Sequence, residues 1–104
     1  MTHYEVSISD KANEDMENIY KYISTTLLLP ETAAKQYDSI ADAILSLEEM
    51  PERIKIMDSE PEHTKGYRLL MVDHYTAVYI IKDNQVIIVR VLYSASDINK
   101  RLSE

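Results

Sequence analysis

The chain has 104 residues, so two domains of half that size would each be too small to bury a stable core, and we expect one domain over residues 1–104. It contains no cysteine, which excludes disulfides, thiolate catalysis and cysteine-based zinc or iron–sulfur sites. Its net charge of −7 argues against a general nucleic-acid-binding protein, which needs a basic surface to displace phosphate counterions.

The first half of the chain predicts a short strand followed by two helices. Residues 4–8 alternate between apolar and polar side chains, as in a strand, and the Ser-Asp pair after them can cap a helix. One apolar stripe at helical spacing covers residues 12–27 and a second covers residues 33–47. Pro30 suits the first position of the second helix, because that position needs no N–H donor. The short connection predicts an antiparallel helical hairpin.

The second half predicts a loop followed by three strands. Residues 51–66 carry two prolines, the only glycine and several charges, which is typical of a loop. β-Branched and aromatic residues dominate residues 67–72, 75–82 and 86–93, and Asp or Asn occupies the short turns between these segments. We therefore expect an antiparallel meander of three strands, with a short helical tail near the C-terminus.

The order of these elements predicts an α+β fold of the form β-α-α-β-β-β. An α-helical hairpin should cover one face of an antiparallel sheet, because each element has one apolar side to bury. The N-terminal residues lack the basic region and apolar run of a signal peptide, and no apolar stretch approaches the ~20 residues of a bilayer span. We therefore expect a cytoplasmic protein without membrane contact.

Charge is distributed unevenly between the two halves. Residues 1–52 hold 3 basic and 11 acidic side chains (3 − 11 = −8), whereas residues 53–104 hold 8 basic and 7 acidic ones (8 − 7 = +1). We expect the two halves to attract different partners.

Four segments in this order carry a family resemblance: SDKANEDMENIYKYI, LPETAAKQYDSIADAILSLEEMPER, GYRLLMVDHYTAVYIIKD and VIIVRVLYSASD. Over residues 4–102 the chain resembles the RelE/ParE superfamily, the toxins of type II toxin–antitoxin systems. The resemblance implies a RelE/ParE-like fold and a microbial toxin of stress response or plasmid stabilisation, neutralised by a cognate antitoxin. RelE-like members cut mRNA in the ribosomal A site, and ParE-like members poison DNA gyrase. The helical hairpin and the string Arg90-Val91-Leu92 are more similar to the ParE-like branch.

The candidate catalytic residues lie on the predicted sheet: Arg68, Arg90 and Tyr93. Ribosome-dependent mRNA cleavage needs cations for the crowded negative charge, together with a proton donor or acceptor. Alternation along the last strand predicts that Arg90 shares a face with Val86 and Ile88. Tyr93 then points the other way. We expect Arg68 and Arg90 to form a concave surface that binds phosphate or a partner carboxylate.

A structural role is the alternative for each of these residues. The two arginines would then pair with acidic side chains of the helices, and Tyr93 would be an aromatic residue at a strand end. The chain also departs from the ribonuclease members, because Thr76 stands where they carry a sheet arginine and residues 94–97 stand where they carry a basic run. The three histidines do not cluster and no glycine-rich phosphate loop is present, so we expect neither a metal nor a cofactor.

These observations favour a toxin that binds a protein target such as DNA gyrase. The alternatives are a ribosome-dependent mRNA endoribonuclease and a degenerate toxin that is only a binding module. No direct binding of free nucleic acid is expected. The antitoxin should lay an amphipathic helix or strand along the sheet and the hairpin. The candidate antitoxin contacts are Ile19, Ile23, Leu27, Leu28, Arg68 and Arg90.

Overall fold

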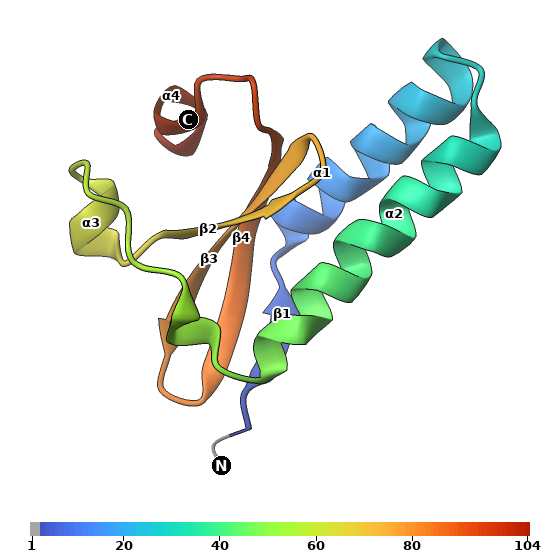
Figure 1. Ribbon diagram of the computed structural model, residues 1–104. Coiled ribbons are helices and arrows are strands. Elements are labelled where there is room, and N and C mark those ends of the chain that lie inside the picture. Colours follow the sequence, from blue (N-terminus) through green and yellow to red (C-terminus); the bar gives the residue numbers. More distant parts are fainter. Residues whose placement is uncertain (1–2) are drawn as a thin grey trace.

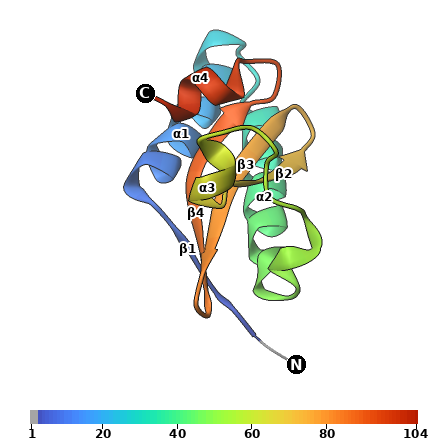
Figure 2. The ribbon, with the colours of Figure 1, turned by 90° about the vertical axis from the view of Figure 1, so that its left-hand side faces the viewer.

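The computed structural model describes residues 3–104 and confirms the α+β fold, with a helical hairpin packed on one face of a four-stranded sheet (Figure 1). Two shorter helices lie on the opposite side of the sheet (Figure 2). In chain order the main elements are β1 (Glu5–Ile8), α1 (Asp10–Lys21), a π-helical turn (Tyr22–Thr26), α2 (Pro30–Leu45), α3 (Glu62–Lys65), β2 (Arg68–Val72), β3 (Tyr75–Lys82), β4 (Gln85–Tyr93) and α4 (Ile98–Leu102).

Local signals fix both ends of the helical hairpin. Ser9 caps α1, because its hydroxyl accepts a hydrogen bond from the Ala12 N–H at 3.1 Å, and Pro30 occupies the first turn of α2. Between the helices the chain reverses at Leu28, which has a φ of 59°. The Leu29 N–H donates to the Ile23 carbonyl at 3.0 Å, so the left-handed residue closes the helix end.

The sheet has the strand order β1-β4-β3-β2. Strands β2, β3 and β4 form the predicted antiparallel meander, with Asp73 and Asp83 at positive φ in the two turns. Strand β1 pairs in parallel with β4, and Val6 lies opposite Val86, so the complete sheet is mixed. The sequence predicted no partner for this strand. A parallel partner requires a long crossover connection, and here the hairpin and the meander together supply it.

A β-bulge interrupts the pairing of β3 with β4. Val78 pairs with Arg90 and Tyr79 pairs with Ile88, which leaves Val89 as an extra residue on β4. Alternation of side chains is therefore reset in the middle of β4. The prediction that Arg90 shares a face with Val86 and Ile88 is wrong for this reason.

The main core fills the space between the hairpin and the sheet. Tyr79 lies at its centre with no exposed surface, and its hydroxyl donates to the Pro51 carbonyl at 2.7 Å. Burial raises the pKa of Tyr79. The buried residues of this core are Ala12, Met16, Ile40, Ile44, Leu47, Ala77, Tyr79, Val86, Ile88 and Val91.

In residues 3–104 no helix is both long and apolar enough to cross a membrane.

A polar cluster joins α3 to α4 on the other side of the sheet. The Glu62 carboxylate is buried, and it accepts hydrogen bonds from the Ser59 hydroxyl at 2.7 Å and the Asn99 amide at 2.9 Å. Asn99 also donates to the Ser59 hydroxyl at 2.8 Å. The predicted loop over residues 51–66 thus contains a short helix that the sequence analysis did not predict, and it is tied to the C-terminal helix.

Candidate functional site

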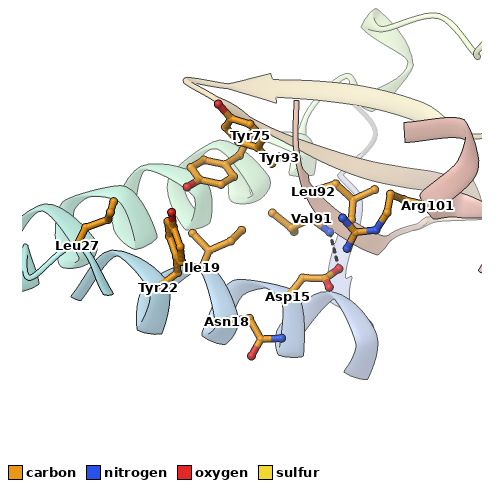
Figure 3. A pocket seen from close by; sticks show the side chains of 10 residues that line it. All are labelled: Asp15, Asn18, Ile19, Tyr22, Leu27, Tyr75, Val91, Leu92, Tyr93 and Arg101. Atoms are coloured by element: carbon orange, nitrogen blue, oxygen red, sulfur yellow. Dashed lines mark hydrogen bonds between the residues drawn. The ribbon is translucent and has the colours of Figure 1, made fainter. Parts of the chain in front are cut away.

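A groove of about 610 Å³ opens between α1 and the adjoining ends of β3 and β4 (Figure 3). It extends from Leu27, near the hairpin tip, to Arg101 on α4 (Figure 3). Most of its lining is apolar or aromatic, which is typical of a surface that receives a hydrophobic partner. The residues that line it are Asp15, Asn18, Ile19, Tyr22, Leu27, Tyr75, Val91, Leu92, Tyr93 and Arg101.

Two tyrosines of neighbouring strands form one wall of this groove. Tyr75 and Tyr93 are register partners at the ends of β3 and β4, and their rings meet edge to face with centroids 5.8 Å apart. Burial raises the pKa of Tyr75. Tyr93 is 52% exposed, and Tyr22 on the opposite wall is 54% exposed. A partner in the groove could therefore bury substantial aromatic surface.

Arg90 is fixed inside the protein by an ion pair with Asp15 of α1. Its Nε and Nη2 atoms donate to the two carboxylate oxygens at 2.7 and 3.0 Å, and the Val91 N–H donates to the same carboxylate at 3.0 Å. Arg90 also donates to the Arg101 carbonyl at 3.3 Å. The hydrogen bond with Asp15 raises the pKa of Arg90. This geometry favours the structural alternative for Arg90, since the guanidinium joins α1, β4 and α4.

Arg68 lies on the opposite face of the sheet from Arg90. Its register partner on β3 is Tyr79, whereas Arg90 pairs with the adjacent residue Val78. Neighbouring residues of a strand point to opposite faces, so the predicted concave surface shared by the two arginines is wrong. The Arg68 guanidinium donates to the carbonyls of Ile54 and Glu52, and thereby holds the loop that precedes β2.

The predicted hydrophobic contacts occupy three different environments. Ile19 and Leu27 line the groove. Ile23 is only 6% exposed and faces the interior, so little of its side chain is accessible to a partner. Leu28 lies at the hairpin tip, outside the groove lining, and is 77% exposed.

Several residues of the groove were not predicted from the sequence, among them Asp15, Tyr22 and Tyr75. A signal was present for Asp15, because it lies three residues after Ala12 and four before Ile19 on the apolar stripe of the helix. A carboxylate on such a stripe is expected to be buried and paired. The contribution of Arg101 had no local signal, because α4 reaches the groove only through tertiary packing.

The comparisons with known proteins concern the family and the fold. Residues 6–98 match the model of a family described as the ParE toxin of the type II toxin–antitoxin system parDE. No curated protein matches the chain. The fold is similar to that in a structure of the chromosomal ParDE system from P. aeruginosa, with a TM-score of 0.73 and 23% identity over 88% of this chain and 96% of that chain.

Two further solved structures share the fold. A chain of the toxin–antitoxin complex RelBE2 from Mycobacterium tuberculosis gives a TM-score of 0.62 and 22% identity, over 88% of this chain and 99% of that chain. A chain of the YoeB dimer from Staphylococcus aureus gives a TM-score of 0.57 and 19% identity, over 88% of this chain and 98% of that chain. At these identities the likeness concerns the fold.

Proposed function

Because the chain belongs to the ParE toxin family of type II toxin–antitoxin systems, we propose that it inhibits growth by binding a protein target such as DNA gyrase. The observation that carries this choice is the ion pair of Arg90 with Asp15. A ribonuclease of this fold needs cations gathered around the reacting phosphate. Here the Arg90 guanidinium is paired with Asp15 of α1, and the Arg68 guanidinium donates to backbone carbonyls on the other face of the sheet. The two arginines therefore do not converge on one site.

The charge of the helical hairpin also supports a protein target of this kind. Residues 10–45 hold seven acidic and three basic side chains, a net charge of −4. Enzymes that handle DNA present basic surfaces to the phosphate backbone. An acidic hairpin is attracted to such a surface, which raises the rate of encounter. In this proposal the chain acts in the cytoplasm, in plasmid stabilisation or a stress response.

We also propose that the groove binds an amphipathic helix of the cognate antitoxin. Ile19, Leu27 and Tyr93 would cover the apolar side of that helix. Arg101 lies at one end of the groove and contacts Glu104 at 3.2 Å, with both side chains substantially exposed. An antitoxin carboxylate can compete for this guanidinium, because exposed ion pairs contribute little free energy.

A ribosome-dependent mRNA endoribonuclease is the second candidate. It is favoured by Tyr93, which presents a half-exposed phenol at the end of β4. That phenol lies against the ring of Tyr75. A phenol acts as a general base near neutral pH only when nearby cations lower its pKa from about 10.

Gyrase supercoiling assays with the purified chain test the first proposal. We expect supercoiling to be inhibited and then restored by the antitoxin, while primer extension on ribosome-bound mRNA shows no A-site cuts. Full gyrase activity at saturating toxin, together with A-site cuts, would establish the ribonuclease instead. Normal growth after induction without antitoxin would indicate an inactive binding module.

A further inference from the structure

The helical wall of the groove ends in a single turn of π-helix, Tyr22–Thr26. Hydrogen bonds in a π-turn span five residues instead of the four of an α-helix, and such turns are rare and frequently lie at functional sites. Here the Leu27 N–H donates to the Tyr22 carbonyl at 3.1 Å. Leu27 therefore lies one turn after Tyr22, and the two side chains follow one another along the groove (Figure 3).

A continuous α-helix would place Leu27 on a different side of the chain. Its repeat would put Leu27 one turn after Ile23, on the apolar stripe that also contains Met16. Met16 and Ile23 are 2% and 6% exposed and lie outside the groove lining. Thr26 would then be the residue that follows Tyr22. The π-turn thus presents Leu27 to the groove in place of Thr26.

The side chain of Thr25 supports the π-turn. Its hydroxyl donates to the Lys21 carbonyl at 2.6 Å, and the Ser24 hydroxyl donates to the same carbonyl at 3.4 Å. In an α-helix this carbonyl accepts the backbone N–H of residue 25, and a hydroxyl bonded to the carbonyl four residues back disturbs the regular helix. Thr25 is exposed but lies outside the groove lining, so its effect on a ligand of the groove passes through the backbone.

We propose that Thr25 is a positioning residue for antitoxin binding, because its hydroxyl holds the π-turn that presents Leu27 to the groove. This inference rests on the proposal that an antitoxin helix occupies the groove. The chain belongs to a family of type II toxins, and Arg101 offers a cation at the opposite end of the groove from Leu27. The occupant is therefore an amphipathic helix with an apolar side chain near the hairpin tip and a carboxylate near α4.

Antitoxin affinity of the full chain, measured by isothermal titration, tests the role of Thr25. Thr25→Val removes the hydroxyl and keeps the shape of the side chain. It should weaken binding about 5- to 10-fold, because Leu27 then leaves the groove. Thr25→Ser keeps the hydroxyl and should bind like the unaltered chain. Thr26→Val, the same exchange at the next exposed position, is the matched control and should also bind normally.

A double-mutant cycle separates positioning from a general effect on the fold. Leu27→Ala alone should weaken antitoxin binding about 10-fold, through the loss of part of a buried leucine. In the Leu27→Ala background, Thr25→Val should cause no further loss, because it acts through Leu27. A merely structural role of Thr25 would lower the affinity by the same factor in both backgrounds. If Thr25→Val does not fold, Thr25→Ala takes its place with the same expected results.

The contrary outcomes distinguish this inference from the groove proposal. Normal antitoxin binding by Thr25→Val, together with weaker binding by Leu27→Ala, would overturn the inference and leave the groove proposal intact. Equal losses in the two backgrounds would also overturn it, as would a loss in Thr26→Val as large as that in Thr25→Val. Normal binding by both Leu27→Ala and Tyr93→Ala would overturn the groove proposal, and the inference with it.

Discussion

Asp15 illustrates how one buried side chain can hold together elements that are distant in sequence. Its carboxylate receives two hydrogen bonds from Arg90 and one from the Val91 N–H. Both members of the ion pair are about nine-tenths buried, so neither can be removed without leaving the other poorly solvated. The pair therefore fixes α1 against β4. Well-packed apolar residues in the same place could stabilise the fold equally well, but removal of one partner alone is costly.

Substitution Asp15→Ala should lower the free energy of unfolding by about 3–5 kcal/mol, because it leaves the Arg90 guanidinium buried and unpaired. Urea denaturation measures this loss. Glu17→Ala, at an exposed position on the same helix, is the control and should change the free energy by less than about 0.5 kcal/mol. Similar values for the two variants would contradict a structural role for the pair.

Tyr79 predicts a loss of stability at alkaline pH. Burial raises its pKa above the ordinary value of about 10, so the folded state holds this proton more tightly than the unfolded state. The contribution is complete below about pH 10 and is lost as the pH rises toward the folded pKa. Tyr79→Phe should flatten this alkaline decline in denaturation curves and cost about 1 kcal/mol at neutral pH through the lost hydrogen bond to Pro51. An alkaline decline as steep in Tyr79→Phe as in the unaltered chain would contradict this assignment.

At the residue scale, local contacts were predictable and distant ones were not. Ser9 caps the helix by accepting a hydrogen bond from the Ala12 N–H, only three residues further along the chain, so the local sequence predicts this contact. The partner of Arg90 lies 75 residues away along the chain, and several acidic residues of the helices competed for that role. The sequence suggested an acid on a helix as the structural alternative, but it could not say which one.

At the element scale, periodicity predicted the strands well, and the interruption of periodicity was missed. The meander and both turns agree with the alternation of apolar residues. The bulge at Val89 adds one residue to β4, and no glycine marks it: residues 86–89 are all β-branched, and Arg90 follows directly. The prediction that Arg90 shares a face with Val86 and Ile88 failed because the bulge lies between them, whereas Tyr93 points away from Arg90 as predicted, because both residues follow the bulge.

The contact between α3 and α4 predicts a local effect on stability. Asn99→Ala removes the amide that bridges Ser59 and Glu62, and should reduce the stability of this contact by about 0.5–1.5 kcal/mol. Hydrogen exchange of the α4 amides should become faster while exchange in β3 and β4 stays slow. Lys100→Ala is the control on the same short helix. Uniform acceleration across the chain would show that α4 unfolds only with the whole protein.

At the scale of the whole molecule, the groove predicts antitoxin affinity. Tyr93→Ala removes a half-exposed ring from one wall, so the antitoxin should bind about 10- to 100-fold more weakly, while the fold loses little packing. Isothermal titration with the antitoxin measures this change. Met71→Ala is the control, because Met71 is 68% exposed on β2 and lies outside the groove. Equal affinity of the two variants would place the antitoxin elsewhere.

The overall arrangement was predictable because each element has one apolar side that only a two-layer packing can bury. The groove was less predictable, since its walls come from α1, two strand ends and α4, whose residues adjoin only in the folded chain. Of the predicted contacts, Ile19 and Leu27 belong to it. The contact between Tyr75 and Tyr93 on one wall, and the position of Arg101 at one end, could be identified only from the three-dimensional structure.

The parallel pairing of β1 with β4 has a consequence for biosynthesis. The Ser9 hydroxyl donates to the Val89 carbonyl, so the first strand finds its neighbours only among residues made some 80 positions later. Loop closure over such a span is slow and must wait for the template strand. Until β4 has been made, the polypeptide can hold a completed hairpin without a completed sheet. The groove between α1 and the strand ends would thus arise late in folding, so a partner that binds there recognises only molecules whose sheet is finished.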